Sequence, residues 1–442
     1  MISSGPRWQP TPALSRSVLL PIVLAGVGLA AGRVELVLLG VPLIVGTALA
    51  LGGTRPPDGV PRVRAIGPKI TDVGRPATVA VEIEPSEAQM ITTVLVPESP
   101  GSLAERVATA APAEQPRHIV GESTPTTWGT QVLARPDHLV VGADALFIAG
   151  PVTAAPRTAQ VLPAVTTTLP PGPLPARPAG MVGAHRSQRP GEGTELHDVS
   201  PFAPGDRLRR IDWRVTARQA GPHELLYTRH TQVDADADVI CCLDSRFDLQ
   251  PEVRLWSEPA TPEDSHDAGP RSIDIGVDTV ASIAAAYIAH GDRVGVLDLT
   301  RQMDTVRLGS GSRHLLRLRT YLARHTHRPG TADTSALPRR VPRFPPGAVV
   351  VVASVFMDDA VAALATSWRR SGHPVLAVDV LPTPVVRMAD PAATLAARVV
   401  IAERDERLRS LAASGVLVTS AEPAALALSL TRLRRVAGRA RR

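Results

Sequence analysis

Apolar residues follow different spacings along the chain, and the longest apolar runs stand near its beginning. Residues 17–32 are apolar without a charge, and residues 36–53 are apolar again after a short charged interruption. Each run is close to the roughly 17–25 residues that a helix needs to cross a bilayer. Gly28 and Gly32 form a small-xxx-small pair, which allows close approach of two helices. The pattern predicts a transmembrane helical hairpin within residues 1–54; the alternative is one buried hydrophobic hairpin in a soluble domain.

Basic residues flank the two apolar runs at both outer ends. They are Arg7, Arg16, Arg55, Arg62, Arg64 and Lys69. The positive-inside rule then predicts that the N-terminus and everything after residue 54 face the cytoplasm. The adjacent Cys241 and Cys242 agree, because they lie in an apolar run without disulfide or metal-binding spacing, as expected in a reducing compartment. We therefore expect a two-pass protein of the cell membrane with the bulk of the chain in the cytoplasm.

The next hundred residues have the period of β-strands. Residues 77–84 alternate apolar and polar positions, residues 138–141 and 158–162 are short β-like runs, and Pro and Gly punctuate at short intervals. This pattern predicts a small antiparallel β-sandwich-like domain over residues 55–163. The Pro-rich residues 164–182 predict a semi-rigid extended linker.

From residue 237 onward, apolar runs of strand length alternate with helical periodicity. Residues 239–243 and 348–353 are continuously apolar, as buried parallel strands are. The other expected strands are 294–299, 305–308, 374–380 and 416–418. The expected helices are 273–289, 313–324, 359–370, 395–413 and a basic C-terminal helix at 423–436. The alternation predicts a doubly wound α/β domain with a parallel sheet over residues 237–442.

Between the linker and this domain, residues 183–236 carry a dense pattern of charge. Pro204-Gly205-Asp206 is typical of a turn, and Asp212-Trp213 follows shortly after it. The neighbouring arginines are Arg207, Arg209, Arg210, Arg214 and Arg218. Carboxylates interleaved with guanidinium groups suit bidentate pairing, and a Trp in an aromatic-poor chain suggests a packed contact. We favour a structural clasp that pins this segment to the following domain over an acceptor surface for an anionic partner, because ion-pair networks mimic functional sites.

This motif resembles the signature of the bacterial DUF58 family, membrane-anchored proteins with a von Willebrand factor A-like (vWA-like) domain. The matching residues are Gly205, Asp206, Arg210, Asp212, Trp213 and Arg218. The resemblance is clearest over 183–245 and extends as a pattern over about 144–420. It implies a non-enzymatic, membrane-tethered adaptor that binds a protein partner. It also implies work with a MoxR-type AAA+ ATPase in assembly or maturation of another complex, with other membrane or envelope proteins and membrane lipid as further partners.

The resemblance also implies a cation site, because vWA-like folds usually hold a divalent metal at an Asp-x-Ser-x-Ser motif and later loops. In this chain the implied ligands of Mg or Mn are Asp244, Asp248, Thr331 and Asp358. Arg246 stands at one of the two Ser positions and brings a positive charge where a cation needs an oxygen. The expected site is therefore degenerate, and the alternative is that Asp244 pairs with Arg246 or caps a helix.

The charge balance and the absence of catalytic motifs define the remaining alternatives. The net charge of +6 favours anionic partners. Aromatic residues are only 3% of the chain, however, and a groove that binds single-stranded nucleic acid needs aromatic side chains on which the bases stack. We therefore expect no nucleic acid partner, although a basic nucleic-acid-binding protein is one alternative. The sequence contains no recognisable pairing of a nucleophile with a base, nor two poised carboxylates. We expect no enzyme, and a hydrolase with an unrecognised site in the β domain is the other alternative.

Overall fold

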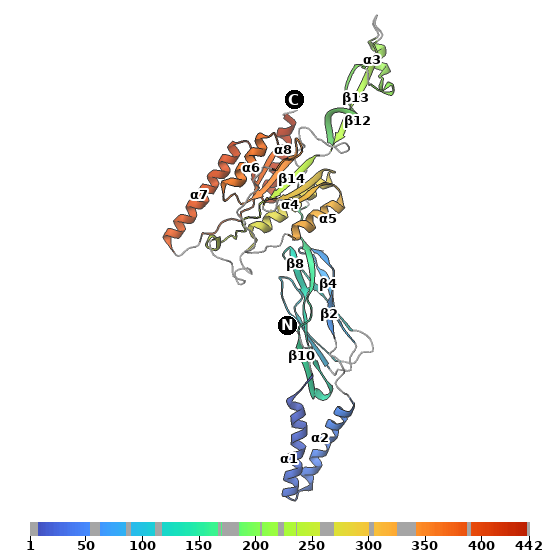
Figure 1. Cartoon of the computed structure of the whole chain (residues 1–442), viewed down its shortest axis with the longest axis vertical. Coiled ribbons are helices and arrows are strands. Elements are labelled where there is room, and N and C mark those ends of the chain that lie inside the picture. Colours follow the sequence, from blue (N-terminus) through green and yellow to red (C-terminus); the bar gives the residue numbers. More distant parts are fainter. Residues whose placement is uncertain are drawn as a thin grey trace. The chain divides into compact units, whose positions relative to one another are not determined.

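The computed structural model forms two compact units, residues 1–162 and 163–442, which are described separately (Figure 1). The described residues are 8–53, 62–84, 90–110, 117–166, 169, 185–203, 206–219, 225–235, 237–256, 269–299, 305–324, 342–386 and 390–439.

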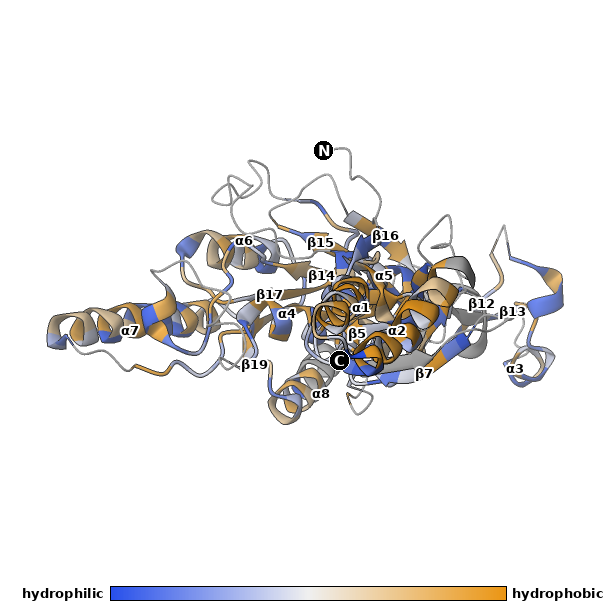
Figure 2. Ribbon diagram, turned by 90° about the horizontal axis from the view of Figure 1, so that it is seen from below, coloured by the Kyte–Doolittle hydropathy of each residue, from blue (hydrophilic) through white to orange (hydrophobic). Residues whose placement is uncertain are grey.

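The first unit begins with the predicted pair of apolar helices, α1 (Pro12–Ala30) and α2 (Val34–Gly53). Both are predominantly hydrophobic, as their colour in Figure 2 shows, and are long enough to cross a membrane. Most of their large apolar side chains are exposed. Gly28 lies where the helices touch, because a Cβ there would stand 2.9 Å from Val37. Gly32, with a φ of +66°, forms the turn between the helices, and only Gly28 of the pair lies in the helix contact.

The remainder of this unit consists of three small sheets. Its strands are β1 (Trp8–Pro10), β2 (Val63–Ile66), β3 (Ile70–Asp72), β4 (Ala77–Ile83), β5 (Met90–Leu95), β6 (Glu105–Ala110), β7 (Arg117–Ser123), β8 (Gly129–Ala134), β9 (Pro136–Val141), β10 (Phe147–Val152) and β11 (Arg157–Leu162). The sheet orders are β1-β10-β9-β5-β6, β3-β11-β8 and β2-β4-β7. Alternate residues of β4 are buried, as the period of two predicts.

Two pairings in this unit differ from a simple antiparallel sandwich of residues 55–163. The β3–β11 pair is parallel. In addition, β1 precedes the helical hairpin and pairs with β10, so residues 8–10 belong to the β-structure. The N-terminal end of the hairpin is therefore joined directly to the five-stranded sheet through β1.

The second unit contains a six-stranded sheet in the order β16-β15-β14-β17-β18-β19. Its strands are β14 (Asp238–Leu243), β15 (Arg293–Asp298), β16 (Thr305–Gly309), β17 (Val349–Ser354), β18 (Val375–Asp379) and β19 (Leu417–Ser420). Five of them are parallel, whereas β16 runs antiparallel to β15, so the sheet is mixed rather than wholly parallel. The strand order extends in both directions from β14, which places a topological switch point between β14 and β17.

Helices cover both faces of this sheet. They are α4 (Ser272–Ala289), α5 (Ser312–Arg324), α6 (Asp359–Arg370), α7 (Pro391–Ala413) and α8 (Pro423–Arg439), with a short 3-10 helix η3 (Val253–Trp256). α6 and α7 pack on one face through Val361, Trp368 and Leu411, and α4 covers the other. α4 is also long and apolar enough to cross a membrane, but 67% of it is buried in this fold. Its apolar character is thus explained by the core.

The beginning of the predicted linker is bound to this second unit. The Pro163 carbonyl accepts a hydrogen bond from Arg319 at 2.6 Å, and the Ala164 N–H donates to Asp278 at 3.0 Å. The Thr166 N–H donates to Ser282 at 2.9 Å. Side chains of α4 and α5 therefore hold residues 163–166 in place. Residues 170–184, the larger part of the predicted linker, lie outside the described residues.

The charged segment forms a two-stranded antiparallel ribbon of β12 (His185–Pro201) and β13 (Tyr227–Ala235). The connection between the strands contains a 3-10 turn, η2 (Leu208–Arg210), and a short helix, α3 (Trp213–Arg218), and both pack on β13. The backbone N–H of Asp212 donates to the Tyr227 carbonyl at 2.8 Å, which fixes α3 to the start of β13.

Candidate functional site

The carboxyl ends of three adjacent parallel strands each supply a polar side chain at the switch point. Asp298 ends β15, Asp244 follows β14 directly, and Ser354 ends β17. All three are buried. Ligand sites of doubly wound sheets lie at this edge, so these residues and the loops after them form the candidate functional site.

Arg246 occupies the centre of this site. Its Nε and Nη2 donate to the two carboxylate oxygens of Asp244 at 2.8 and 3.1 Å, and its Nη1 and Nη2 donate to those of Asp358 at 2.6 and 3.0 Å. The side chains of Arg246 and Asp244 are only 3% and 1% exposed, whereas Asp358 is 38% exposed. A guanidinium fork matches carboxylate geometry in this bidentate way, so the three residues form a clasp between the β14 and β17 loops. We call this trio the Arg246 clasp.

Further hydrogen bonds hold the clasp from the β17 side. The Ser354 hydroxyl donates to Asp244 at 2.6 Å and accepts from the Phe356 N–H at 3.0 Å. Phe356 has a φ of +51°, a left-handed conformation that is costly for a residue with a side chain. Arg407 of α7 donates to the Phe356 carbonyl at 3.0 Å. The loop that carries Asp358 is therefore strained and fixed from two directions.

The charges of the clasp stabilise one another. Burial acts to lower the pKa of Arg246, but hydrogen bonds and attraction from Asp244 and Asp358 outweigh it and raise that pKa above its ordinary value. Burial likewise acts to raise the pKa of Asp358, and Arg246 outweighs it and lowers that pKa. Both groups are consequently ionised at neutral pH. The Arg246 guanidinium also lies 5.2 Å from the centre of the Phe247 ring.

The predicted metal ligands do not come together as a metal site. Asp244 and Asp358 both bind Arg246, and Asp248 lies apart in an ion pair with Arg271, with 2.9 Å between their atoms. Thr331 lies outside the described residues, among which no three His, Cys, Asp or Glu side chains gather as a metal centre requires. A Mg²⁺ or Mn²⁺ ion does not fit here, because a guanidinium fills the place between the two carboxylates. The alternative of an Asp244–Arg246 pair is the observed arrangement.

Two carboxylates of the signature, Asp206 and Asp212, make contacts within their own segment. Asp212 caps α3 by accepting from the Arg214 and Val215 N–H groups at 3.1 and 3.2 Å, and it pairs with Arg229 of β13. Asp206 accepts from the Ala203 N–H at 2.9 Å and so closes the turn; Gly205 lies outside the described residues. The capping and turn-closing contacts of these carboxylates thus shape their own segment.

The position of Trp213 differs from the one predicted from the sequence. This residue was expected to anchor a packed contact, yet 66% of it is exposed. Arg218, in the last turn of α3, is exposed, and Arg210 is half-buried. The residue types indicated a special segment, but the direction of the Trp side chain depends on a fold that the local pattern does not contain.

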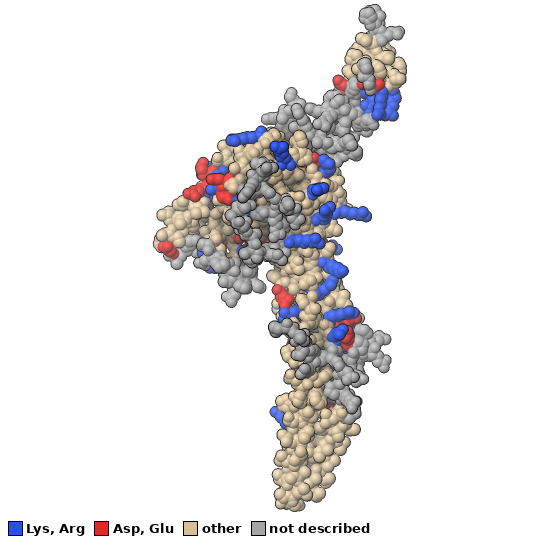
Figure 3. Space-filling view, viewed as in Figure 1, with Lys and Arg blue, Asp and Glu red and all other residues tan. Residues whose placement is uncertain are grey.

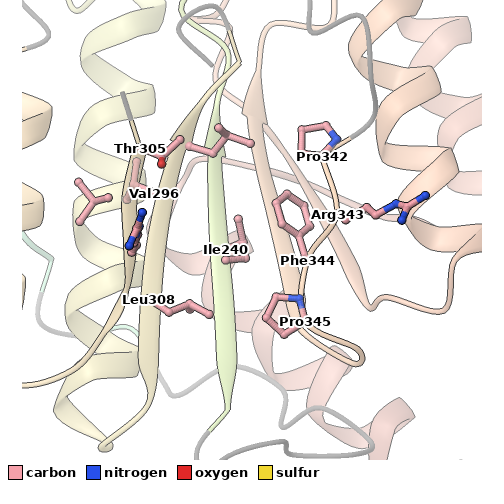
Figure 4. A pocket seen from close by; sticks show the side chains of 11 residues that line it. Ile240, Val296, Thr305, Leu308, Pro342, Arg343, Phe344 and Pro345 are labelled. Atoms are coloured by element: carbon pink, nitrogen blue, oxygen red, sulfur yellow. The ribbon is translucent and has the colours of Figure 1, made fainter. Parts of the chain in front are cut away.

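Sequence reasoning also missed a cavity of about 600 Å³ on the sheet face next to β16. Its wall includes Ile240 of β14, Val296 of β15, Leu308 of β16 and Phe344 from the segment before β17 (Figure 4). Apolar side chains dominate the view, and Arg343 points away from the cavity. Nothing in the local sequence distinguishes these strand residues from ordinary core. In contrast, Asp298 and Ser354 end apolar strands as Asp244 follows one, so the signal that identified Asp244 could have identified them too.

The described chain thus combines two N-terminal apolar helices, a β-rich region, and a mixed six-stranded sheet with helices on both faces. Comparison with protein-family models, with curated proteins and with solved structures found no match to the chain.

Proposed function

We propose that this chain is a membrane-tethered adaptor of the DUF58 type, whose vWA-like domain binds a protein partner without a metal ion. The mixed doubly wound sheet and its switch point support a vWA-like domain. The two N-terminal helices support the tether. The basic residues that flank these helices favour a cytoplasmic position for the rest of the chain.

The observation that carries the metal-free part is the Arg246 clasp. Nitrogen atoms at all three positions of the guanidinium donate to carboxylates of the chain itself. Mg²⁺ requires an octahedral shell of oxygen ligands, and an ion that recognises a partner needs one of these positions for an oxygen of that partner. The Arg246 guanidinium instead fills the space between Asp244 and Asp358. The clasp therefore fixes the loops at the sheet edge and offers no open coordination position to a partner.

The partner proposed from the family resemblance is a MoxR-type AAA+ ATPase, which would remodel a complex that the adaptor holds at the membrane. Other membrane or envelope proteins and membrane lipid are the further partners that the resemblance implies. The strained Phe356 loop, held by Ser354 and Arg407, supports a binding role for this domain, because proteins keep such strain where geometry matters for function.

The test uses the full chain in lipid nanodiscs and a purified MoxR-type ATPase, with empty nanodiscs as the control. Biolayer interferometry without nucleotide should show saturable binding to the chain that persists in EDTA. Two results would contradict the proposal. An absence of binding in every nucleotide state would reject the ATPase as partner, and loss of binding in EDTA with recovery in Mg²⁺ would reject the metal-free interface.

A further inference from the structure

Among its described residues, the connection between β12 and β13 carries three exposed large apolar side chains, and the two most exposed belong to its helical parts. Leu208 of η2 is 70% exposed and Trp213 at the start of α3 is 66% exposed. Both belong to the short connection that packs on β13. They lie outside the two apolar N-terminal helices, so a membrane-spanning role does not explain them.

The exposure of Trp213 is exceptional within this chain. The other four Trp residues are Trp8, Trp128, Trp256 and Trp368, and each is buried or half-buried. The chain is poor in aromatic residues, at 3%. Trp is also the residue type most enriched among the positions that dominate protein–protein binding energy. An exposed Trp in the same connection as an exposed Leu therefore indicates a contact surface.

The segment that carries these two side chains has a net positive charge. Residues 206–219 contain five arginines and two aspartates, a net charge of +3. Arg214 and Arg218 are both exposed and stand four positions apart, on one face of α3. Asp212 is occupied by capping α3 and by Arg229. Figure 3 shows blue side chains gathered on the segment that carries α3.

We propose that Leu208, Trp213, Arg214 and Arg218 form a docking surface for an acidic protein segment that presents an apolar side chain. This inference rests on the proposed adaptor function and adds a second contact with the partner, in the signature segment that precedes the vWA-like domain. The apolar pair supplies the contact that is dehydrated on binding, and the arginines attract and orient carboxylates. The Arg246 clasp cannot do this, because its guanidinium is 3% exposed and already paired.

The test compares variants of the full chain in nanodiscs of zwitterionic lipid. The docking variants are Trp213→Ala and the double variant Arg214→Glu/Arg218→Glu. The matched controls are Leu395→Ala, at a site 64% exposed on α7, and Arg370→Glu/Arg398→Glu, which makes the same change in charge at exposed positions. All the replaced side chains are exposed, so the melting temperatures should agree and establish that each variant folds.

Four probes are used with each variant: the MoxR-type ATPase, an acidic synthetic peptide with one Trp and two Leu, the same peptide with Gln and Asn in place of Glu and Asp, and vesicles of anionic lipid. We expect the acidic peptide to bind the wild-type chain and the neutral peptide to bind at least about tenfold more weakly. Each docking variant should weaken acidic-peptide binding by about tenfold or more, and the controls should leave it within about twofold.

The results separate this inference from the adaptor proposal. If the ATPase binds and no variant weakens the binding of the ATPase or of the acidic peptide, the docking surface is wrong and the adaptor proposal stands. If the ATPase does not bind while the acidic peptide binds through Trp213, the docking surface stands and the ATPase is rejected. If neither peptide binds but anionic vesicles bind in a Trp213-dependent way, the surface faces lipid and the inference is overturned. If no probe binds, it is overturned as well.

Discussion

Two regions of this molecule are rich in Asp and Arg, and they differ in what surrounds those charges. In the Arg246 clasp a buried guanidinium is paired with two carboxylates. On the docking surface, Asp212 binds backbone N–H groups, while Arg214 and Arg218 extend into solvent beside Trp213. The same residue types thus form a closed interior network in one place and an open charged surface in the other.

Burial determines the energetic consequence of this difference. Removal of one member of a buried pair leaves an uncompensated charge in a poorly solvated site, whereas water solvates an exposed arginine whatever its neighbours are. Substitutions in the clasp should therefore change the stability of the fold, and substitutions on the docking surface should change binding. The following predictions test that division.

The largest expected effect follows from Arg246→Ala. This change leaves Asp244 buried without its cation, so we expect the free energy of unfolding of the α/β unit to fall by about 3–5 kcal/mol. Arg214→Ala should change it by less than about 0.5 kcal/mol, because that side chain is exposed. Thermal unfolding of the full chain in nanodiscs, followed by circular dichroism, measures both. Equal effects of the two changes would remove the distinction between the regions.

Ser354→Ala should have a smaller effect on the same unit. It removes the hydroxyl that joins Asp244 to the Phe356 N–H, and both partners are left in a buried setting. We expect a loss of about 1–3 kcal/mol in the free energy of unfolding, measured in the same way. Ser371→Ala, whose exposed hydroxyl bonds only within its helix, is the matched control and should be nearly neutral. If Ser354→Ala leaves the free energy of unfolding unchanged, the loop after β17 does not depend on this hydroxyl for its conformation.

Asp278 is a carboxylate whose pKa is determined mainly by burial and less by a neighbouring cation. Burial, helped by Asp274, raises the pKa of Asp278 to about 6, and the Ala164 N–H and Arg319 only partly oppose it. The native state therefore binds a proton at Asp278 more tightly than the unfolded chain does. As a consequence, the stability of the fold rises as pH falls from about 7 toward about 4. Asp278→Asn keeps an acceptor oxygen for Ala164.

We expect Asp278→Asn to stabilise the unit by about 1–2 kcal/mol at pH 7, with the advantage disappearing near pH 4. Melting temperatures of the variant and the wild type across this pH range measure the difference. An advantage that is constant with pH would show that the charge of Asp278 is not its cause.

In the segment that carries the docking surface, Asp212 should affect local structure because it caps α3, whereas Trp213 should not. Asp212→Ala removes the acceptor for two N–H groups and the partner of Arg229, which costs about 1 kcal/mol in the stability of that segment. Trp213→Ala should be neutral for stability, since its side chain is largely exposed. Hydrogen exchange of the β12–β13 backbone amides distinguishes the two, and protection lost equally in both variants would return Trp213 to the packed role first expected of it.

The sequence pattern was sufficient for the parts of the fold that depend on local periodicity. The apolar helices α1 and α2 and the buried strands β14 and β17 lie where continuous apolar runs predicted them. The position of Asp244 at a strand end was also predictable, because a polar residue after a buried apolar strand must lie at the edge of the sheet.

Features that depend on distant partners could not be read from the pattern. The pairing of β1 with β10 joins residues more than a hundred positions apart, and the reversed direction of β16 leaves no trace in its composition. The same holds for Trp213, since a Trp beside arginines is compatible with either a packed or an exposed position. For Arg246 the sequence left two outcomes open, and its hydrogen bonds to Asp244 and to the distant Asp358 show which one the fold adopts.

The central claim, that Arg246 takes the place of a metal ion, is tested most directly by titration with Mg²⁺ and Mn²⁺. The melting temperature of the full chain in nanodiscs would be followed for the wild type and for Asp244→Ala. A cation that binds only the native state at 100 times its dissociation constant would add about 2.7 kcal/mol of stability, a shift of several degrees. The clasp predicts no shift in either protein up to millimolar metal. A saturable rise that Asp244→Ala abolishes would show that the metal site is intact and that the clasp opens to accept a cation.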